Sequence, residues 1–191
     1  MSAPRWLTPA ERRTLEAALE RLFPADDAGA PGARGAGVAD YVDGLLGAFL
    51  VDPPRIWAGG PFSGRHGGDD GFSTFLTLGP VEELAWRTRI EGSQGRPERE
   101  WNGPVVGWQE RYRAGLAGLG TDFAELDGAA QDARLADDPD FADLLHTHGC
   151  EGLYGDPVYG GNRGGAGWRS IAFAGDAQPR GHTPVEVTGR E

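Results

Sequence analysis

The side chains best suited to metal chemistry lie close together in this chain, at His146, His148 and Cys150. His146 and Cys150 are four residues apart, so a helix would place them on one face, where imidazole and thiolate could bind a metal ion. No third ligand follows at a standard spacing, and Glu151 would be a weak fourth. A structural role explains them better, because histidine suits the C-terminal end of a helix and a single cysteine packs as a small apolar residue. We therefore expect no metal site.

Other kinds of active site are also poorly supported. The chain contains no lysine, which excludes Schiff-base catalysis and Walker-type phosphate loops. It has five serines and no G-x-S-x-G segment, so a nucleophilic serine is not indicated. Gly32, Gly35 and Gly37 follow a predicted helix with G-x-x-G-x-G spacing, which is not the dinucleotide fingerprint. Asp69 and Asp70 stand between glycines and are better interpreted as an exposed turn than as a cation site. We expect neither catalytic residues nor a cofactor in this chain.

Charge and composition narrow the possible partners. The 191 residues carry a net charge of −11, which argues against a nucleic-acid partner. Residues 121–157 hold ten acidic residues against one base, Arg134, a net charge of −9. Such a face is solvated or meets a basic patch on a partner. Cys150 is the single cysteine, so it cannot form an internal disulfide.

No apolar run approaches the ~20 residues needed to span a bilayer. We also see no signal peptide at the N-terminus, because no basic start is followed by an apolar stretch. From these features we expect a cytoplasmic protein without a membrane span.

The most distinctive segment combines turn-forming residues with large rings. Its members are Gly152, Tyr154, Asp156, Pro157, Tyr159, Gly160, Gly161, Asn162 and, slightly later, Trp168. We call this segment, residues 152–168, the motif. We predict that it is a loop following a helix, that Asp156 closes an Asx turn and that Asn162 is left-handed. Such a loop is ordered only if its rings dock on this domain or on another protein.

The helical pattern predicts an all-α fold. We expect one irregular helical domain, residues 1–175, of about five or six helices with long Gly/Pro-rich loops, and a flexible C-terminal tail, residues 176–191. A capping box at Thr8–Glu11 starts the first helix, which Pro24 ends. The further helices are expected near residues 38–50, 80–90, 104–119, 129–136 and 139–149.

The remaining segments are expected to be irregular. Residues 24–37, 58–71 and 92–103 are predicted loops, and residues 72–78 a short helix or turn. The one alternating β-branched stretch is 185–187.

In the helix near 104–119, Trp108, Tyr112, Leu116 and Leu119 fall on one face. Other rings lie in or beside the loops: Trp57, Phe62, Trp86, Trp101 and again Trp108. They are expected to anchor the core or the loops, and at least one of them could insert into a partner or stack on a sugar.

Two segments resemble the gluconate 2-dehydrogenase subunit 3 family. The first is residues 15–33, where a leucine-bearing helix runs into Leu-Phe-Pro-Ala-Asp and then Pro-Gly-Ala. The second is residues 141–175, which read Phe-x-x-Leu-Leu, then His-Thr-x-Gly-x-Glu-Gly-x-Tyr-Gly-Asp-Pro-x-Tyr-Gly-Gly-Asn, then Gly-Trp-x-x-Ile-x-Phe-x-Gly. Residues 52–104 match only loosely.

The resemblance implies a non-catalytic small subunit. In that family the subunit pairs with a flavoprotein of the glucose-methanol-choline (GMC) type, which holds FAD and oxidises a sugar or alcohol. A cytochrome c subunit often takes the electrons. The small subunit is thought to support maturation, folding or export of the flavoprotein.

Many members begin with a twin-arginine export signal, whereas here Arg12 and Arg13 lie inside the first predicted helix. A periplasmic or membrane-associated complex would therefore need a signal that was removed or that the partner carries. Two alternatives remain open from the residues: an independent carbohydrate-binding domain, and a metal or haem carrier.

Overall fold

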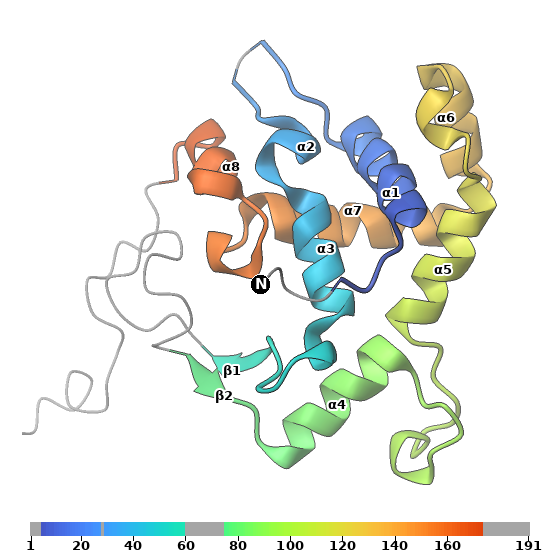
Figure 1. Ribbon diagram of the computed structural model, residues 1–191, viewed down its shortest axis with the longest axis vertical. Coiled ribbons are helices and arrows are strands. Elements are labelled where there is room, and N and C mark those ends of the chain that lie inside the picture. The colour runs from blue at the N-terminus through green and yellow to red at the C-terminus, as the bar shows by residue number, and fades with distance from the viewer. Residues whose placement is uncertain (1–4, 28, 60–74, 174–191) are drawn as a thin grey trace, which may run out of the picture.

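The computed structural model describes residues 5–27, 29–59 and 75–173. Figure 1 shows helices packed around one another with a two-stranded sheet at one edge. In chain order the elements are α1 (Pro9–Leu22), α2 (Gly32–Ala36), α3 (Val38–Leu46), η1 (Ala48–Leu50), β1 (Trp57–Gly59), β2 (Leu76–Thr77), α4 (Pro80–Glu91), η2 (Pro97–Arg99), α5 (Trp108–Leu119), η3 (Phe123–Glu125), α6 (Gly128–Ala136), α7 (Pro139–Tyr154), η4 (Pro157–Tyr159), η5 (Arg163–Gly165) and α8 (Ala166–Ser170). Helices make up about 64% of the described part of the chain and strands about 4%, which confirms the all-α prediction.

Helix α1 starts where its capping residues place it. The Thr8 hydroxyl accepts the Glu11 N–H at 3.2 Å, and the Glu11 carboxylate accepts the Thr8 N–H at 2.8 Å. These two bonds satisfy backbone donors that the first helical turn leaves without partners. The helix then buries Leu15 and Leu19 completely. The predicted capping box is confirmed.

Helix α7 lies at the centre of the arrangement. It packs against α3, α1 and α6, and Figure 1 shows it crossing behind α3 and α1. The main core consists of buried apolar side chains from these helices and α5, among them Leu15, Val42, Leu116 and Leu145. As predicted for α5, Tyr112, Leu116 and Leu119 are buried, and Trp108 packs against the core.

The predicted loop at residues 24–37 is wrong, because its second half forms α2. The start of α2 is tied to the end of α1: the Ala33 N–H bonds to the Phe23 carbonyl at 2.9 Å, and the Arg34 N–H to the Glu20 carboxylate at 2.8 Å. Gly37 ends α2 in the left-handed conformation, with φ 71°, which glycine adopts at little cost. Helix propensity alone did not indicate this turn, because two of its five residues are glycine, which disfavours the helix relative to alanine.

The predicted helix starting at Pro104 begins instead at Trp108. The preceding residues stay extended because Val105 pairs with Ser93: the Ser93 N–H bonds to the Val105 carbonyl at 3.0 Å, and the Val105 N–H to the Ser93 hydroxyl at 3.1 Å. The expected polar linker at 92–103 is also more ordered than predicted. It contains η2, whose Arg99 side chain is buried and pairs with Glu91 at 2.9 Å.

The second predicted helix, near residues 38–50, is shorter than predicted, and the segment after β1 also differs from its prediction. Helix α3 ends at Leu46, and Gly47 separates it from η1. Within residues 72–78, predicted as a short helix or turn, Leu76–Thr77 forms a strand antiparallel to β1. The pairing of the two strands satisfies backbone N–H and C=O groups of this segment. Phe62, Asp69, Asp70 and the segments 176–191 and 185–187 lie outside the described residues.

Helix α7 does not end at Gly149 as predicted but continues to Tyr154. The glycines near its end permit close packing rather than termination. A Cβ on Gly149 would lie 2.2 Å from Cε2 of Phe23, and one on Gly152 would lie 2.9 Å from Cγ1 of Val38. Gly152 and Tyr154 therefore belong to the last turns of a helix, and the loop of the motif starts at Gly155.

Candidate functional site: the motif and the adjoining cavity

The motif leaves α7 through a turn that its own side chains close. The Val158 N–H bonds to the Asp156 carboxylate at 2.9 Å, which confirms the predicted Asx turn. Pro157 begins the 3₁₀ turn η4, and Gly160 ends it with φ 102°. The positive φ explains why glycine occupies this position. The segment reverses direction within a few residues and returns to the surface of α7.

Asn162 fixes the returning chain. It is fully buried and left-handed, with φ 44° and ψ 44°, as predicted. Its side-chain amide donates to the Gly155 carbonyl at 2.8 Å, and its side-chain oxygen accepts the Gly167 N–H at 2.8 Å. Its backbone N–H bonds to the Gly152 carbonyl at 2.7 Å. One residue thus joins the end of α7, the turn and the start of α8.

Two glycines allow this close approach of backbone to backbone. A Cβ on Gly161 would lie 2.1 Å from the Gly152 carbonyl oxygen. A Cβ on Gly167 would fall against the Leu153 carbonyl oxygen at an equally forbidden distance. Any larger residue at either position would push the motif away from α7.

The rings of the motif pack in two directions. The indole N–H of Trp168 donates to the Tyr154 carbonyl at 2.6 Å, and the Trp168 ring meets Phe173 edge to face at 5.3 Å. Tyr159 instead meets Phe75 edge to face at 5.7 Å, beside the small sheet. The rings of Trp168 and Tyr159 therefore dock on this domain, one of the two outcomes expected from the sequence.

Part of the apolar surface formed by these rings and by Ile171 still faces solvent. Tyr154 is 39% exposed, Ile171 55% and Phe173 48%, and Trp168 is half-buried. We call these four residues the motif patch. Grouped exposed apolar side chains on a well-ordered backbone are typical of a surface that contacts another protein.

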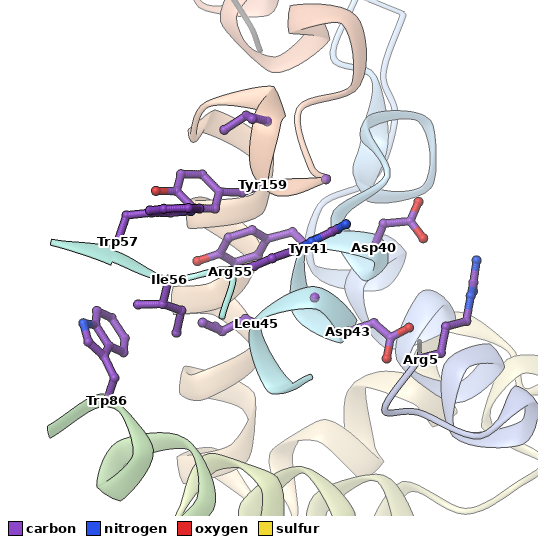
Figure 2. Close-up of a pocket in the computed structure, with 13 residues that line it drawn as sticks. Arg5, Asp40, Tyr41, Asp43, Leu45, Arg55, Ile56, Trp57, Trp86 and Tyr159 are labelled. Carbon is purple, nitrogen blue, oxygen red and sulfur yellow. The ribbon is translucent and has the colours of Figure 1, made fainter. Parts of the chain in front are cut away.

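A cavity of about 340 Å³ adjoins the other side of the motif. Figure 2 shows its two halves. Apolar side chains form one half, drawn from α3, β1, α4 and η4: Tyr41, Leu45, Ile56, Trp57, Trp86 and Tyr159. Charged side chains form the other: Asp40, Asp43 and Arg5, with Arg55 extending between the halves.

The two carboxylates of the charged half are already engaged. Asp40 accepts Arg12 at 2.7 Å and Arg163 at 2.5 Å. Asp43 is buried and accepts the backbone N–H groups of Trp6 and Leu7, each at 2.9 Å. These bonds tie the N-terminal segment and the motif to α3, so the carboxylates serve the fold.

Tyr41 connects the cavity wall to α7. Its hydroxyl donates to the Glu151 carboxylate at 2.7 Å. Burial and the neighbouring Glu151 charge raise the pKa of Tyr41 far above its usual range. The ring therefore stays neutral and fixed.

The histidines and the cysteine do not converge. His146 Nε2 lies 4.0 Å from Cys150 Sγ, while the His146 ring stacks on Phe23 at 5.3 Å. His148 instead points into the core, where its Nδ1 lies 2.9 Å from the Tyr112 hydroxyl. Within the described ranges, no three His, Cys, Asp or Glu side chains are grouped as a metal would require.

Sequence reasoning found the motif but not the cavity. Nothing in the sequence marks Tyr41, Leu45, Asp40, Asp43 or Arg55 as residues of a site. The cavity forms where α3, the small sheet and η4 meet, and these segments are far apart in sequence. The available signals were three rings that the sequence singles out and that line the cavity: Trp57, Trp86 and Tyr159.

Among the described helices, none combines the length and the apolar character needed to cross a membrane. A family model described as gluconate 2-dehydrogenase subunit 3 matches residues 9–175. The match spans α1, the residues around the cavity except Arg5, and the whole motif. No curated protein and no solved structure gives a significant match.

Proposed function

Because this chain belongs to the gluconate 2-dehydrogenase subunit 3 family, we propose that it is the non-catalytic small subunit of an FAD-dependent sugar or alcohol dehydrogenase. Its partner is a GMC-type flavoprotein, which holds the FAD and carries out the oxidation. The small subunit supports maturation or stability of that flavoprotein, and a cytochrome c subunit could take the electrons. The family name supports the role of a subunit in a dehydrogenase complex.

The motif patch is the observation that carries this proposal. Tyr154 and Trp168 present ring surface from a backbone that Asn162 holds by several hydrogen bonds. A surface that is ordered before binding loses little conformational entropy when a partner docks. Aromatic side chains are also enriched at the centres of protein interfaces.

Co-expression with the flavoprotein tests the proposal. The flavoprotein should be soluble, loaded with FAD and copurified when this chain is present, and markedly less soluble or less active when it is absent. If the flavoprotein is equally soluble and active without this chain, the proposal fails.

A matched pair of variants locates the contact. Ile171→Asp places a charge on the motif patch, and Val81→Asp places the same charge on α4, where Val81 is also exposed. We expect Ile171→Asp to weaken copurification at least about tenfold, as truncation at interface centres does, and Val81→Asp to leave it unchanged. Equal behaviour of the two variants would show that the motif patch is not the contact.

Carbohydrate binding is the second candidate, and the cavity favours it. Tyr41 and Tyr159 present rings within a cavity wide enough for a monosaccharide, and sugars stack on such rings. Calorimetry of the purified chain with a panel of sugars distinguishes the two functions. Saturable heat that is lost in Tyr159→Ala would support a carbohydrate-binding domain, whereas no heat with any sugar agrees with the subunit role.

A further inference from the structure

We propose that the cavity between α3, β1 and the motif is a socket, that is, a binding site for one segment of the catalytic flavoprotein. That segment carries an apolar side chain next to a carboxylate. This inference rests on the proposed function and names the chemistry of the partner segment. The motif contributes to both surfaces, because Tyr159 and Gly160 line the cavity while Tyr154 and Trp168 belong to the motif patch.

The apolar half of the cavity determines the first requirement. Leu45, Ile56 and Trp86 line it together with the rings of Tyr41 and Tyr159 (Figure 2). The volume of the whole cavity, about 340 Å³, lies at the low end of the range for binding pockets, about 300–1,000 Å³. A cavity of this size accepts one or two apolar side chains, which gain free energy by leaving water.

The charged half determines the second requirement. Asp40 and Asp43 are engaged by Arg12, Arg163 and backbone N–H groups. Arg5 and Arg55 form no ion pair with a carboxylate among the described residues. The available charge at the cavity is therefore cationic, although the chain as a whole carries −11. A guanidinium in this position favours a carboxylate, which it can bind through two hydrogen bonds.

The engaged carboxylates also disfavour other ligands. A metal ion or a basic peptide would have to compete with Arg12 and Arg163 for Asp40, whereas Asp43 is buried and its Oδ1 already accepts the backbone N–H groups of Trp6 and Leu7. Breaking such partly buried pairs is costly, since the remaining arginine would be left without its partner. The carboxylate of an acidic, apolar segment would instead pair with Arg5 or Arg55, which form no ion pair among the described residues.

Gly44 provides a sharp test of the apolar half. It lies in α3 on the cavity wall, and among the described residues a Cβ there would contact only the Tyr159 carbonyl oxygen, at 3.7 Å. Gly44→Leu should therefore fold, because leucine is the better helix former, and should fill the cavity. Gly118→Leu makes the same exchange in α5, where a Cβ meets nothing within 4 Å. We expect Gly44→Leu to weaken binding to the flavoprotein at least about tenfold and Gly118→Leu to leave it unchanged.

Arg55 provides the test of the charged half. Arg55→Gln removes the charge at the cavity, and Arg13→Gln removes one from an exposed position of α1. As a probe for the isolated chain we would use indole-3-propionate and its uncharged amide, followed by NMR chemical shifts. The acid should bind more tightly than the amide to wild type and to Arg13→Gln. This preference should disappear in Arg55→Gln, and both compounds should fail to bind Gly44→Leu.

The outcomes separate the two proposals. If wild type and all four variants bind the flavoprotein equally well, the proposal that the cavity binds the flavoprotein is wrong, while the proposed role as a subunit stands. If wild type does not bind at all, the proposed function itself fails. If the acid binds no more tightly than the amide, the requirement for a carboxylate is wrong. If Gly44→Leu lowers the melting temperature of the isolated chain relative to Gly118→Leu but leaves the complex intact, this chain or a second copy fills the cavity, and the inference is overturned.

Discussion

Tyr112 and His148 form a buried polar pair that joins α5 to α7. The Tyr112 hydroxyl lies 2.9 Å from His148 Nδ1, and the two rings are nearly parallel, with centroids 5.7 Å apart. Trp108 closes the other side of the imidazole edge to face at 4.6 Å. Burial, and secondarily the charge of Arg111, lowers the pKa of His148 to about 4. The imidazole is therefore a neutral part of the core.

This pKa makes the stability of the fold depend on pH. In the unfolded chain His148 regains its usual pKa of 6.5. Between pH 6.5 and about 4, the unfolded state therefore binds a proton at His148 that the folded state does not bind. The stabilisation is complete above pH 6.5 and is lost as the pH falls toward 4. The pKa difference corresponds to roughly 3 kcal/mol. Urea unfolding at pH 7, 5.5 and 4.5 should show the decline.

The control for this prediction lies on the same helix. His148→Gln should be less stable than wild type at pH 7, because a buried partner of Tyr112 is replaced, but its stability should vary less with pH. His146→Gln, which alters a histidine outside the core, should keep the wild-type pH dependence. If His148→Gln follows the same pH curve as wild type, His148 is not the titrating group.

Asn162 should be the most sensitive single residue of the motif. Asn162→Ala removes the bonds to Gly155 and Gly167 and places alanine at φ 44°. Buried backbone groups without partners cost about 1–3 kcal/mol each, and the left-handed conformation costs about 1 kcal/mol more. We expect a loss of about 2–4 kcal/mol in denaturant unfolding. Asn102→Ala, at an exposed position, should be neutral; equal losses in both variants would contradict this account.

Gly149 and Gly118 should respond in opposite directions to alanine. Both lie within helices, where alanine is normally the better residue by about 1 kcal/mol. At Gly149 the new methyl group would overlap Phe23, whereas at Gly118 it would meet open space. We expect Gly149→Ala to lower the melting temperature by several degrees, since overpacking costs about 1–3 kcal/mol. Gly118→Ala should raise it, and a rise in both variants would show that α7 and Phe23 are not in close contact.

The elements that the sequence predicts well are those with local signals. Thr8 and Glu11 cap α1 through bonds that span three residues, and Asp156 closes its turn through a bond that spans two. The end of α7 was predicted wrongly because glycine has two uses. Gly149 looks like a helix stop, but its role is to make room for Phe23, which is more than a hundred residues away in the sequence.

By itself, the sequence determines the all-α class, the capped start of α1, the buried face of α5 and the turn chemistry of the motif. These features depend on backbone preferences and on periodicity within one element, and both are determined by residues close together in the sequence. Only the tertiary structure decides that α7 extends to Tyr154, that Asp40 and Asp43 are occupied, and that Arg55 faces the cavity beside the motif. Each of these depends on distances between segments far apart in the chain, which local propensities do not encode.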